Sequence, residues 1–211
     1  MNQAQRNAQD GISFIQTAEG DLTEVHSMLQ RLNTLSNQSA NGTYVSTDRD
    51  KIQLEVDQLL KEINRITDNS KFNGVNLLNT SATVDFQIGV TKTETLTVTL
   101  SKNGSTALGI NAITVKTVTG AKNAMSAVAA AINTVSTNRA QLGAYQNRLE
   151  HTINSLGVTS ENLSAANSRI KDADMATEMT AFTKNQILVQ AGTAMLAQAN
   201  SAPQSVLKLL G

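Results

Sequence analysis

The chain has 211 residues, of which 17 are Lys or Arg and 17 are Asp or Glu, so its formal net charge at pH 7 is zero. This balance gives no overall attraction to nucleic acid or to an anionic membrane surface. Cysteine is absent, which excludes disulfide bonds and thiolate chemistry. Aromatic residues are only 3% of the chain and Pro203 is its one proline, so the composition favours long helices with aliphatic interfaces. No apolar run reaches the length of about 18 residues that a membrane span needs.

Two helices with a coiled-coil-like apolar face are predicted in the first third of the chain. The first covers about residues 3–36, where apolar positions alternate between spacings of three and four: Ile15, Ala18, Leu22, Val25, Leu29 and Leu32. Asn41-Gly42 indicates a loop after it. The second helix covers about residues 47–69, with the same alternation at Ile52, Val56, Leu59, Ile63 and Ile66. Residues 69–80 are rich in Asn and are expected to form a loop.

The apolar period then changes to two, which is typical of half-buried strands. Val84, Phe86, Ile88 and Val90 alternate with polar residues, as do Leu96, Val98 and Leu100. The intervening TKTE suits a short turn, so a β-hairpin is predicted within about residues 83–118. The segment ITVKTVTG, residues 113–120, is a candidate third strand of this element.

A third helix is predicted over about residues 121–171, because its apolar residues recur at intervals of seven. They are Val128, Val135, Leu142, Leu149, Leu156, Leu163 and Ile170. A strict seven-residue repeat keeps one stripe on one side of a helix that packs on another helix. Gly157 costs roughly 1 kcal/mol relative to alanine in a helix and marks a candidate local break. A last helical segment follows, with a broad face of Ala, Gln and Met, and Pro203 is expected to end it.

These elements predict a mainly α fold. It is an elongated helical rod of long coiled-coil-like helices with a small β-hairpin, plus a projecting C-terminal helix. The apolar residues near the end of the chain have no evident partner in the preceding helices, so we expect them to meet another chain.

Several long motifs resemble bacterial flagellin. They are RNAQDGISFIQTAEG at residues 6–20, NRLEHTI at 147–153, SRIKDADMA at 168–176, AMLAQAN at 194–200 and PQSVLKLL at 203–210. The resemblance covers almost the whole chain. It implies a structural subunit of the flagellar filament, which acts in motility, self-assembles through its terminal helices with other flagellin subunits, and carries no catalytic residues and no cofactor.

The resemblance also implies a domain plan and a location. Residues 1–174 correspond to an inner rod domain, and residues 175–211 correspond to the C-terminal axial helix segment. The subunit is expected to pass from the cytoplasm through the flagellar type III export system to the extracellular filament. The N-terminal axial helix and the variable outer domains of the family have no counterpart here, so this polypeptide alone is not expected to form a normal filament.

The C-terminal segment is the candidate binding surface. By resemblance, it packs against other subunits in the filament and is covered by the flagellar export chaperone beforehand, as an amphipathic helix that hides apolar anchors. The expected contact residues are Met179, Phe182, Ile187, Leu188, Ala191, Met195, Leu196, Val206, Leu207 and Leu210. The alternative is a helix that folds back on the core of its own chain.

A second candidate surface lies near the end of the first helix. Gln30, Arg31, Leu35 and Gln38 match the segment of the family that the host Toll-like receptor for flagellin contacts. Asn33 and Thr34 depart from the basic and acidic residues common at these positions. The alternative for Arg31 is an ordinary solvated charge on a helix.

Other functions have little support in the sequence. His26 and His151 fall on separate predicted helices and are not expected to bind a metal together. No phosphate-binding loop and no Ser-His-Asp arrangement is present. Two further alternatives are the hook–filament junction protein, which has similar terminal helices, and a soluble module that serves as a chaperone-bound export cargo.

Overall fold

The computed structural model describes the backbone of residues 1–171 and 175–210, and the side chains of 1–171 and 175–200. Its elements in chain order are α1 (Asn2–Ala40), α2 (Ser46–Asn69), β1 (Lys71–Phe72), β2 (Val75–Asn76), β3 (Thr83–Gln87), β4 (Thr95–Thr99), α3 (Val118–Lys171) and α4 (Met175–Leu210). The prediction of a mainly α fold with long helices and a small hairpin is confirmed. None of the helices, over the residues described, has a stretch long and apolar enough to cross a membrane.

The chain divides into two compact units, residues 1–160 and residues 161–211. The first unit holds α1, α2, both sheets and the larger part of α3, and the second holds the end of α3 and α4. This division follows packing. The plan of an inner rod domain over 1–174 and an axial segment over 175–211 stays a prediction.

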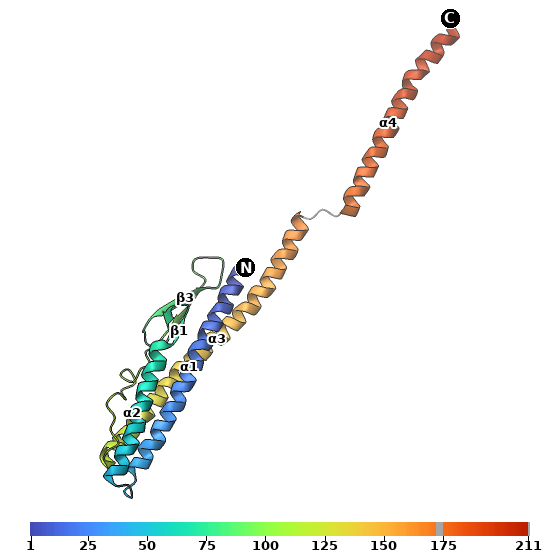
Figure 1. Cartoon of the computed structure of the whole chain (residues 1–211). Helices are drawn as coiled ribbons and strands as arrows, with labels where there is room; N and C mark the ends of the chain where they lie inside the picture. The colour runs from blue at the N-terminus through green and yellow to red at the C-terminus, as the bar shows by residue number, and fades with distance from the viewer. Residues whose placement is uncertain (172–174, 211) are drawn as a thin grey trace. The chain divides into compact units, whose positions relative to one another are not determined.

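The first unit is built on helices that lie side by side (Figure 1). The predicted apolar face of α1 is its buried face, since all six of its residues are 1% exposed or less. Val128, Val135, Leu142 and Leu149 of α3 belong to the same core. The alternation of threes and fours therefore identified the residues that join α1 to the rest of the unit.

The buried face of α2 is wider than the apolar pattern in the sequence indicates. Leu59 and Ile66 are only half-buried, whereas Leu60 and the polar residues Gln53 and Thr67 are buried. The reason is that α2 contacts more than α1: Gln53 also reaches the segment between β4 and α3 through a hydrogen bond. Because α2 is in contact on two sides, its buried residues do not form a single narrow stripe.

The predicted hairpin consists of β3 and β4 in antiparallel register. Val84 lies opposite Val98 and Phe86 lies opposite Leu96, so the apolar residues share one face of the sheet. That face meets α1, where the ring of Phe14 stands edge-on to Phe86 at a centroid distance of 5.5 Å. The period of two thus identified both the strands and the face that they bury.

The Asn-rich region after α2 contains a second, smaller hairpin that was predicted as a loop. β1 and β2 pair through Phe72 and Val75, and Asn73 and Gly74 join them with φ values of 48° and 83°. Left-handed conformations at two successive residues are what a two-residue hairpin turn requires, and Asn-Gly is the dipeptide best suited to them. The loop prediction was wrong here because the flanking strands are too short to show a period of two.

The predicted third strand at residues 113–120 does not form. This segment is irregular up to Thr117, and α3 begins at Val118. Side chains of the helices take the place of a neighbouring strand: the Val115 N–H donates to Gln53 Oε1 at 2.7 Å, and Ser39 Oγ donates to the Val115 carbonyl. An alternating sequence forms a strand only where another strand is present to pair with it.

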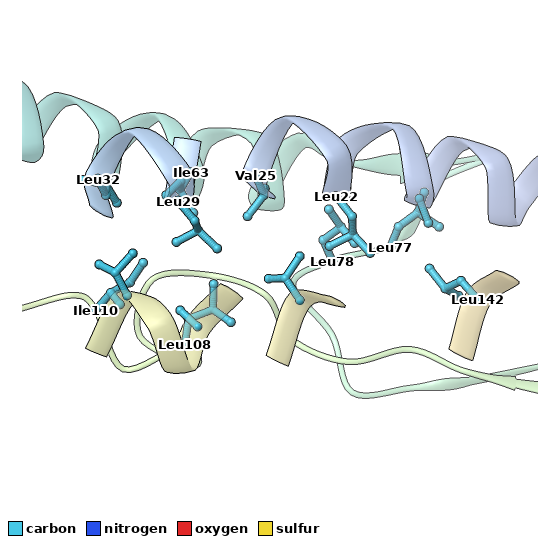
Figure 2. Close-up of a cluster of buried hydrophobic side chains, with 14 of the residues drawn as sticks. Leu22, Val25, Leu29, Leu32, Ile63, Leu77, Leu78, Leu108, Ile110 and Leu142 are labelled. Atoms are coloured by element: carbon cyan, nitrogen blue, oxygen red, sulfur yellow. The ribbon is translucent and has the colours of Figure 1, made fainter. Parts of the chain in front are cut away.

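The whole connection from β4 to α3 is packed against the helices even though it has no regular structure. Leu108 and Ile110 are buried together with Leu29 and Leu32 of α1, as Figure 2 shows. Its polar groups are paired as well, for example Asn103 Oδ1, which accepts a hydrogen bond from Asn138 Nδ2 of α3 at 2.8 Å. Paired polar groups allow an irregular segment to lie in the core without unsatisfied donors or acceptors.

Two predicted helix interruptions are not observed. α3 continues through Gly157, and α4 continues through Pro203 to Leu210. A single glycine lowers helix stability without preventing the helix. The fixed φ of proline is helical, but proline also removes one backbone hydrogen bond, and nothing in the structure explains why α4 continues through it.

Candidate assembly surface

The seven-residue repeat of α3 changes from buried to exposed along its length. Val128, Val135, Leu142, Leu149 and Leu156 are buried in the first unit. Leu163 is 54% exposed and Ile170 is 84% exposed, and both belong to the second unit. The repeat predicts that all of its residues pack on another helix, and Leu163 and Ile170 do not do so within the described part of the chain. The same helical face therefore continues into a part of the molecule where the described residues do not cover it.

A second seven-residue repeat follows in α4. Met175, Phe182, Val189 and Leu196 are each seven residues apart on one continuous helix. Such a spacing places the side chains along one stripe. Leu188 and Met195 are also seven residues apart and lie about 100° further round the helix, so the apolar surface of α4 is wider than one stripe. The side chains of Met175, Met179, Phe182, Ile187, Leu188, Val189, Met195 and Leu196 are exposed by 56–72%. A soluble helix does not normally present a stripe of this length to water.

The surface of α4 also carries a shallow, open hollow, beside the residues of the seven-residue repeat. It is lined by Met179, Thr180, Thr183, Lys184, Ile187 and Leu188. Most of this lining is aliphatic, and the methyl groups of the threonines add to it. The surface of the hollow is therefore mainly apolar.

The charge on α4 is also low for an exposed helix. Glu178, Lys184 and Lys208 are its charged residues, and the other polar positions are Gln, Asn, Ser and Thr. Burying an unpaired charge costs far more free energy than burying a neutral group that finds a hydrogen bond. The composition of α4 therefore suits a helix that becomes surrounded by protein.

The structure places most of the predicted contact residues of the C-terminal segment on its surface. Met179, Phe182, Ile187, Leu188, Ala191, Met195 and Leu196 are all exposed on α4. Val206, Leu207 and Leu210 lie on the same helix, but their side chains are outside the described ones. Sequence reasoning did not select Leu163, Ile170 and Met175 for this surface. Leu163 and Ile170 continue the seven-residue repeat of α3, and Met175 begins that of α4, so these two spacings were the signals that could have found them.

The second candidate surface, on α1, is only partly exposed. Gln30, Arg31 and Gln38 are exposed, and each has a partner within the chain: His26 Nε2 for Gln30, Glu55 for Arg31 and the Tyr44 hydroxyl for Gln38. Leu35 is 2% exposed and belongs to the core. Its predicted role as a contact residue does not agree with this position, because its side chain packs inside the unit beneath the polar residues.

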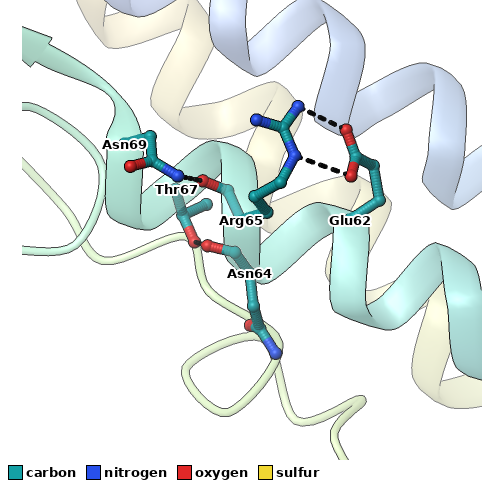
Figure 3. Close-up of polar contacts among 5 residues, drawn as sticks. All are labelled: Glu62, Asn64, Arg65, Thr67 and Asn69. Atoms are coloured by element: carbon teal, nitrogen blue, oxygen red, sulfur yellow. Dashed lines mark hydrogen bonds and ion pairs between the residues drawn. The ribbon is translucent and has the colours of Figure 1, made fainter.

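The outer face of α2 carries an ion pair that is independent of these surfaces. Arg65 Nη2 lies 2.6 Å from Glu62 Oε1, one helical turn away (Figure 3). The hydrogen bond from Arg65 lowers the pKa of the Glu62 carboxyl, and the same contact raises the pKa of Arg65. Both side chains are solvated, so the pair belongs to an ordinary charged helix face.

The histidines and carboxylates of the described residues do not gather into a metal centre. Among the residues described, no group of three or more His, Asp or Glu side chains is arranged to hold a metal ion. His26 contacts Gln30 at 3.0 Å on α1, and His151 is exposed on α3. The apolar stripe of the second unit is therefore the feature of the chain that most needs a functional explanation.

Comparison with known proteins agrees with the motifs. Residues 1–83 match the bacterial flagellin N-terminal helical region, and residues 125–210 match the bacterial flagellin C-terminal helical region. The chain is 50% identical to a flagellin of Halalkalibacterium halodurans and 46% identical to a flagellin of Bacillus subtilis, covering all of this chain and 78% and 81% of those proteins. Among solved structures, Bacillus cereus flagellin matches with a TM-score of 0.66 and 29% identity, over 77% of this chain and 94% of that one.

Proposed function

Because this chain belongs to the bacterial flagellin family and is a structural subunit of the flagellar filament, not an enzyme, we propose that the second unit carries its main contacts with other subunits. The contact surface is the apolar stripe of α4 together with Leu163 and Ile170 of α3. The observation that carries the proposal is the exposure of this stripe along two successive helical segments.

Burial of the stripe provides the driving force for assembly. Transfer of one Leu, Phe or Met side chain from water into a packed interface contributes about 1.5–3 kcal/mol. Several such residues on one subunit offset the loss of translational and rotational freedom on association. Copies of the same chain supply matching helices with the same spacing, which is the geometry that side-by-side helices need for interlocking side chains.

Elongation of sheared flagellin filaments by the labelled, purified chain tests this proposal. Leu188→Asp places a charge near the middle of the described apolar surface of α4 and should reduce incorporation at least tenfold. Leu54→Asp is the matched control, because Leu54 is 65% exposed on α2 in the first unit. Equal incorporation of the Leu188→Asp variant and the unchanged chain would contradict the assignment, and an equal loss for Leu54→Asp would show that the effect is not specific to the stripe.

Before assembly, the same stripe is proposed to bind the flagellar export chaperone, which keeps it from associating in the cytoplasm until export to the outside of the cell. The low charge of α4 and its exposed Phe182 support this role, since an amphipathic helix in an apolar groove relies on such anchors. Titration of the chain with the chaperone by calorimetry tests it. Phe182→Asp should weaken binding at least tenfold, and unchanged affinity would rule out the stripe as the binding site.

For the host Toll-like receptor, we propose that the contact is limited to the exposed polar residues Gln30, Arg31 and Gln38 of α1. Their exposure supports this, and the burial of Leu35 restricts that residue to holding the helix in place. In a receptor reporter-cell assay, Arg31→Ala together with Gln38→Ala should lower the response. If both substitutions leave the response unchanged, Arg31 is an ordinary solvated charge that pairs with Glu55 and does not contact the receptor.

A further inference from the structure

The methionines of this chain differ sharply in their access to solvent. Met175, Met179 and Met195 lie on α4 and are exposed. Met1, Met28 and Met125 in the first unit are half-buried, and Met28 packs against the core. Half of the methionines in the sequence therefore stand in the apolar stripe and are open to reagents in solution.

We propose that these three thioethers form an oxidation-sensitive site that blocks assembly when a peroxide reaches the free subunit. The chemistry is a two-electron transfer of oxygen. The methionine sulfur attacks one oxygen of hydrogen peroxide, and an S–O bond forms as the O–O bond breaks. The other oxygen leaves as hydroxide and takes the proton that the transferred oxygen loses, so that one water is released. The sulfur is oxidised to a sulfoxide and the peroxide is reduced. The predicted effect on assembly rests on the proposed role of α4.

The positions of the three residues explain why a sulfoxide would prevent packing. Met175 is in the same seven-residue stripe as Phe182, and Met195 is in the same stripe as Leu188. Met179 lines the hollow beside Ile187. Oxidation changes a flexible apolar side chain into one with a strong hydrogen-bond acceptor. An acceptor that an apolar neighbour covers loses its hydrogen bonds to water, so the oxidised surface favours water over a neighbouring subunit.

The same geometry predicts protection after assembly. Once the stripe is covered by other subunits, a peroxide no longer reaches the sulfur atoms of α4. The sensitive state is therefore the unassembled subunit. Because methionine sulfoxide is a substrate of methionine sulfoxide reductases, the block should also be reversible.

The first measurement is the order of oxidation in the full chain. The free chain is treated with dilute hydrogen peroxide and its peptides are examined by mass spectrometry over time. We expect Met175, Met179 and Met195 to gain oxygen at least three times faster than Met28. Equal rates at these residues and at Met28 would overturn the assignment of the site, whatever the outcome of any assembly assay.

The second measurement is elongation of filament seeds by the oxidised chain. Incorporation should fall at least tenfold and should recover after treatment with the reductases. The variant Met175→Leu, Met179→Leu, Met195→Leu keeps an apolar stripe of similar volume without sulfur, so it should elongate seeds with or without peroxide treatment. The control variant Met28→Leu, Met125→Leu should remain sensitive.

These variants separate the inference from the proposed function. If the oxidised chain carries the three sulfoxides and still elongates seeds normally, oxidation does not control assembly, although Leu188→Asp can still show that α4 is the contact surface. If Leu188→Asp elongates normally as well, the assembly role of α4 is itself contradicted. A triple leucine variant that peroxide still blocks would place the sensitive group outside α4.

Discussion

Arg139 of α3 is bonded to Glu19 of α1, with 3.0 Å between Arg139 Nη2 and Glu19 Oε1. The two residues are separated by 120 positions in the sequence, and both side chains are partly buried. The ion pair therefore joins the first and the third helix directly, beside the core that the same helices share.

A double-mutant cycle should detect this pair as a coupling between α1 and α3. Glu19→Gln and Arg139→Met should each lower the free energy of unfolding, and the interaction energy from the cycle should be about 0.5–1 kcal/mol. Urea unfolding followed by tyrosine fluorescence suits the measurement, because Tyr44 and Tyr145 both lie in the first unit. The more exposed pair of Arg31 and Glu55 should give a smaller interaction energy. An interaction energy of zero for Arg139 and Glu19 would show that their contact adds nothing to stability.

The buried and exposed parts of the seven-residue repeat should respond differently to the same substitution. Leu149→Ala should lower the free energy of unfolding of the first unit by about 2–5 kcal/mol, because it removes a fully buried side chain and leaves a cavity. Leu163→Ala should change it by less than about 0.5 kcal/mol, because Leu163 is exposed. Both values come from urea unfolding of the monomeric chain. Similar losses for the two variants would mean that the repeat is covered along its whole length.

Gly11 lies where α1 packs closely against Leu149 of α3 and Phe86 of the hairpin. A Cβ atom at this position would lie 3.1 Å from Leu149 Cδ1 and 3.3 Å from Phe86 Cδ1. Gly11→Val should therefore lower the free energy of unfolding by about 1–3 kcal/mol through overpacking, despite the better helix propensity of valine. Gly20→Val is the control in the same helix, where a Cβ would meet no atom within 4 Å, and it should change stability by no more than about 0.5 kcal/mol. Equal effects at the two glycines would argue that the helices can separate at Gly11.

Acid should loosen the tip of the β3–β4 hairpin through Glu94. Hydrogen bonds from the backbone N–H groups of Thr91 and Val90 hold the pKa of this carboxyl below its ordinary value. A lowered pKa in the folded state means that the stabilisation is complete above the ordinary pKa and is lost as the pH falls through the lower, folded value. The amide NMR signals of Val90 and Thr91 should shift together over that acidic range. In Glu94→Gln the side chain does not titrate, so the joint shift should be absent, and a shift that persists would point to another group.

The hairpin tip also shows which features the sequence pattern predicts and which it does not. The alternation of apolar residues predicted β3 and β4 and the face that they bury, and TKTE was expected to be a turn. That the turn is held by one carboxylate was not evident, because the contact depends on Gly89: a Cβ there would overlap the Glu94 side chain. Local patterns report which face of an element is apolar, but they do not report which polar side chain closes a particular turn.

The irregular connection before α3 marks a second limit. Residues 113–120 have the composition of a strand, yet the Val115 backbone bonds to Gln53 and Ser39, which lie 62 and 76 positions away. The burial of Leu35 beneath the exposed Gln38 has a similar origin. In both cases the outcome depended on side chains that come from distant parts of the chain.

By itself, the sequence determined the long helices, the hairpin and the stripe of each helix that is apolar, because these follow from residue spacing and local backbone geometry. It also contained the motifs that identify the family. Only the tertiary structure decided which parts of each stripe are covered. Leu149 and Leu163 have the same spacing and the same chemistry, but Leu149 is buried beside Gly11 of α1, whereas Leu163 is exposed. A side chain is buried only where another part of the structure covers it. A seven-residue apolar repeat predicts that a helix face needs such a neighbour, but it does not show whether the neighbour is present.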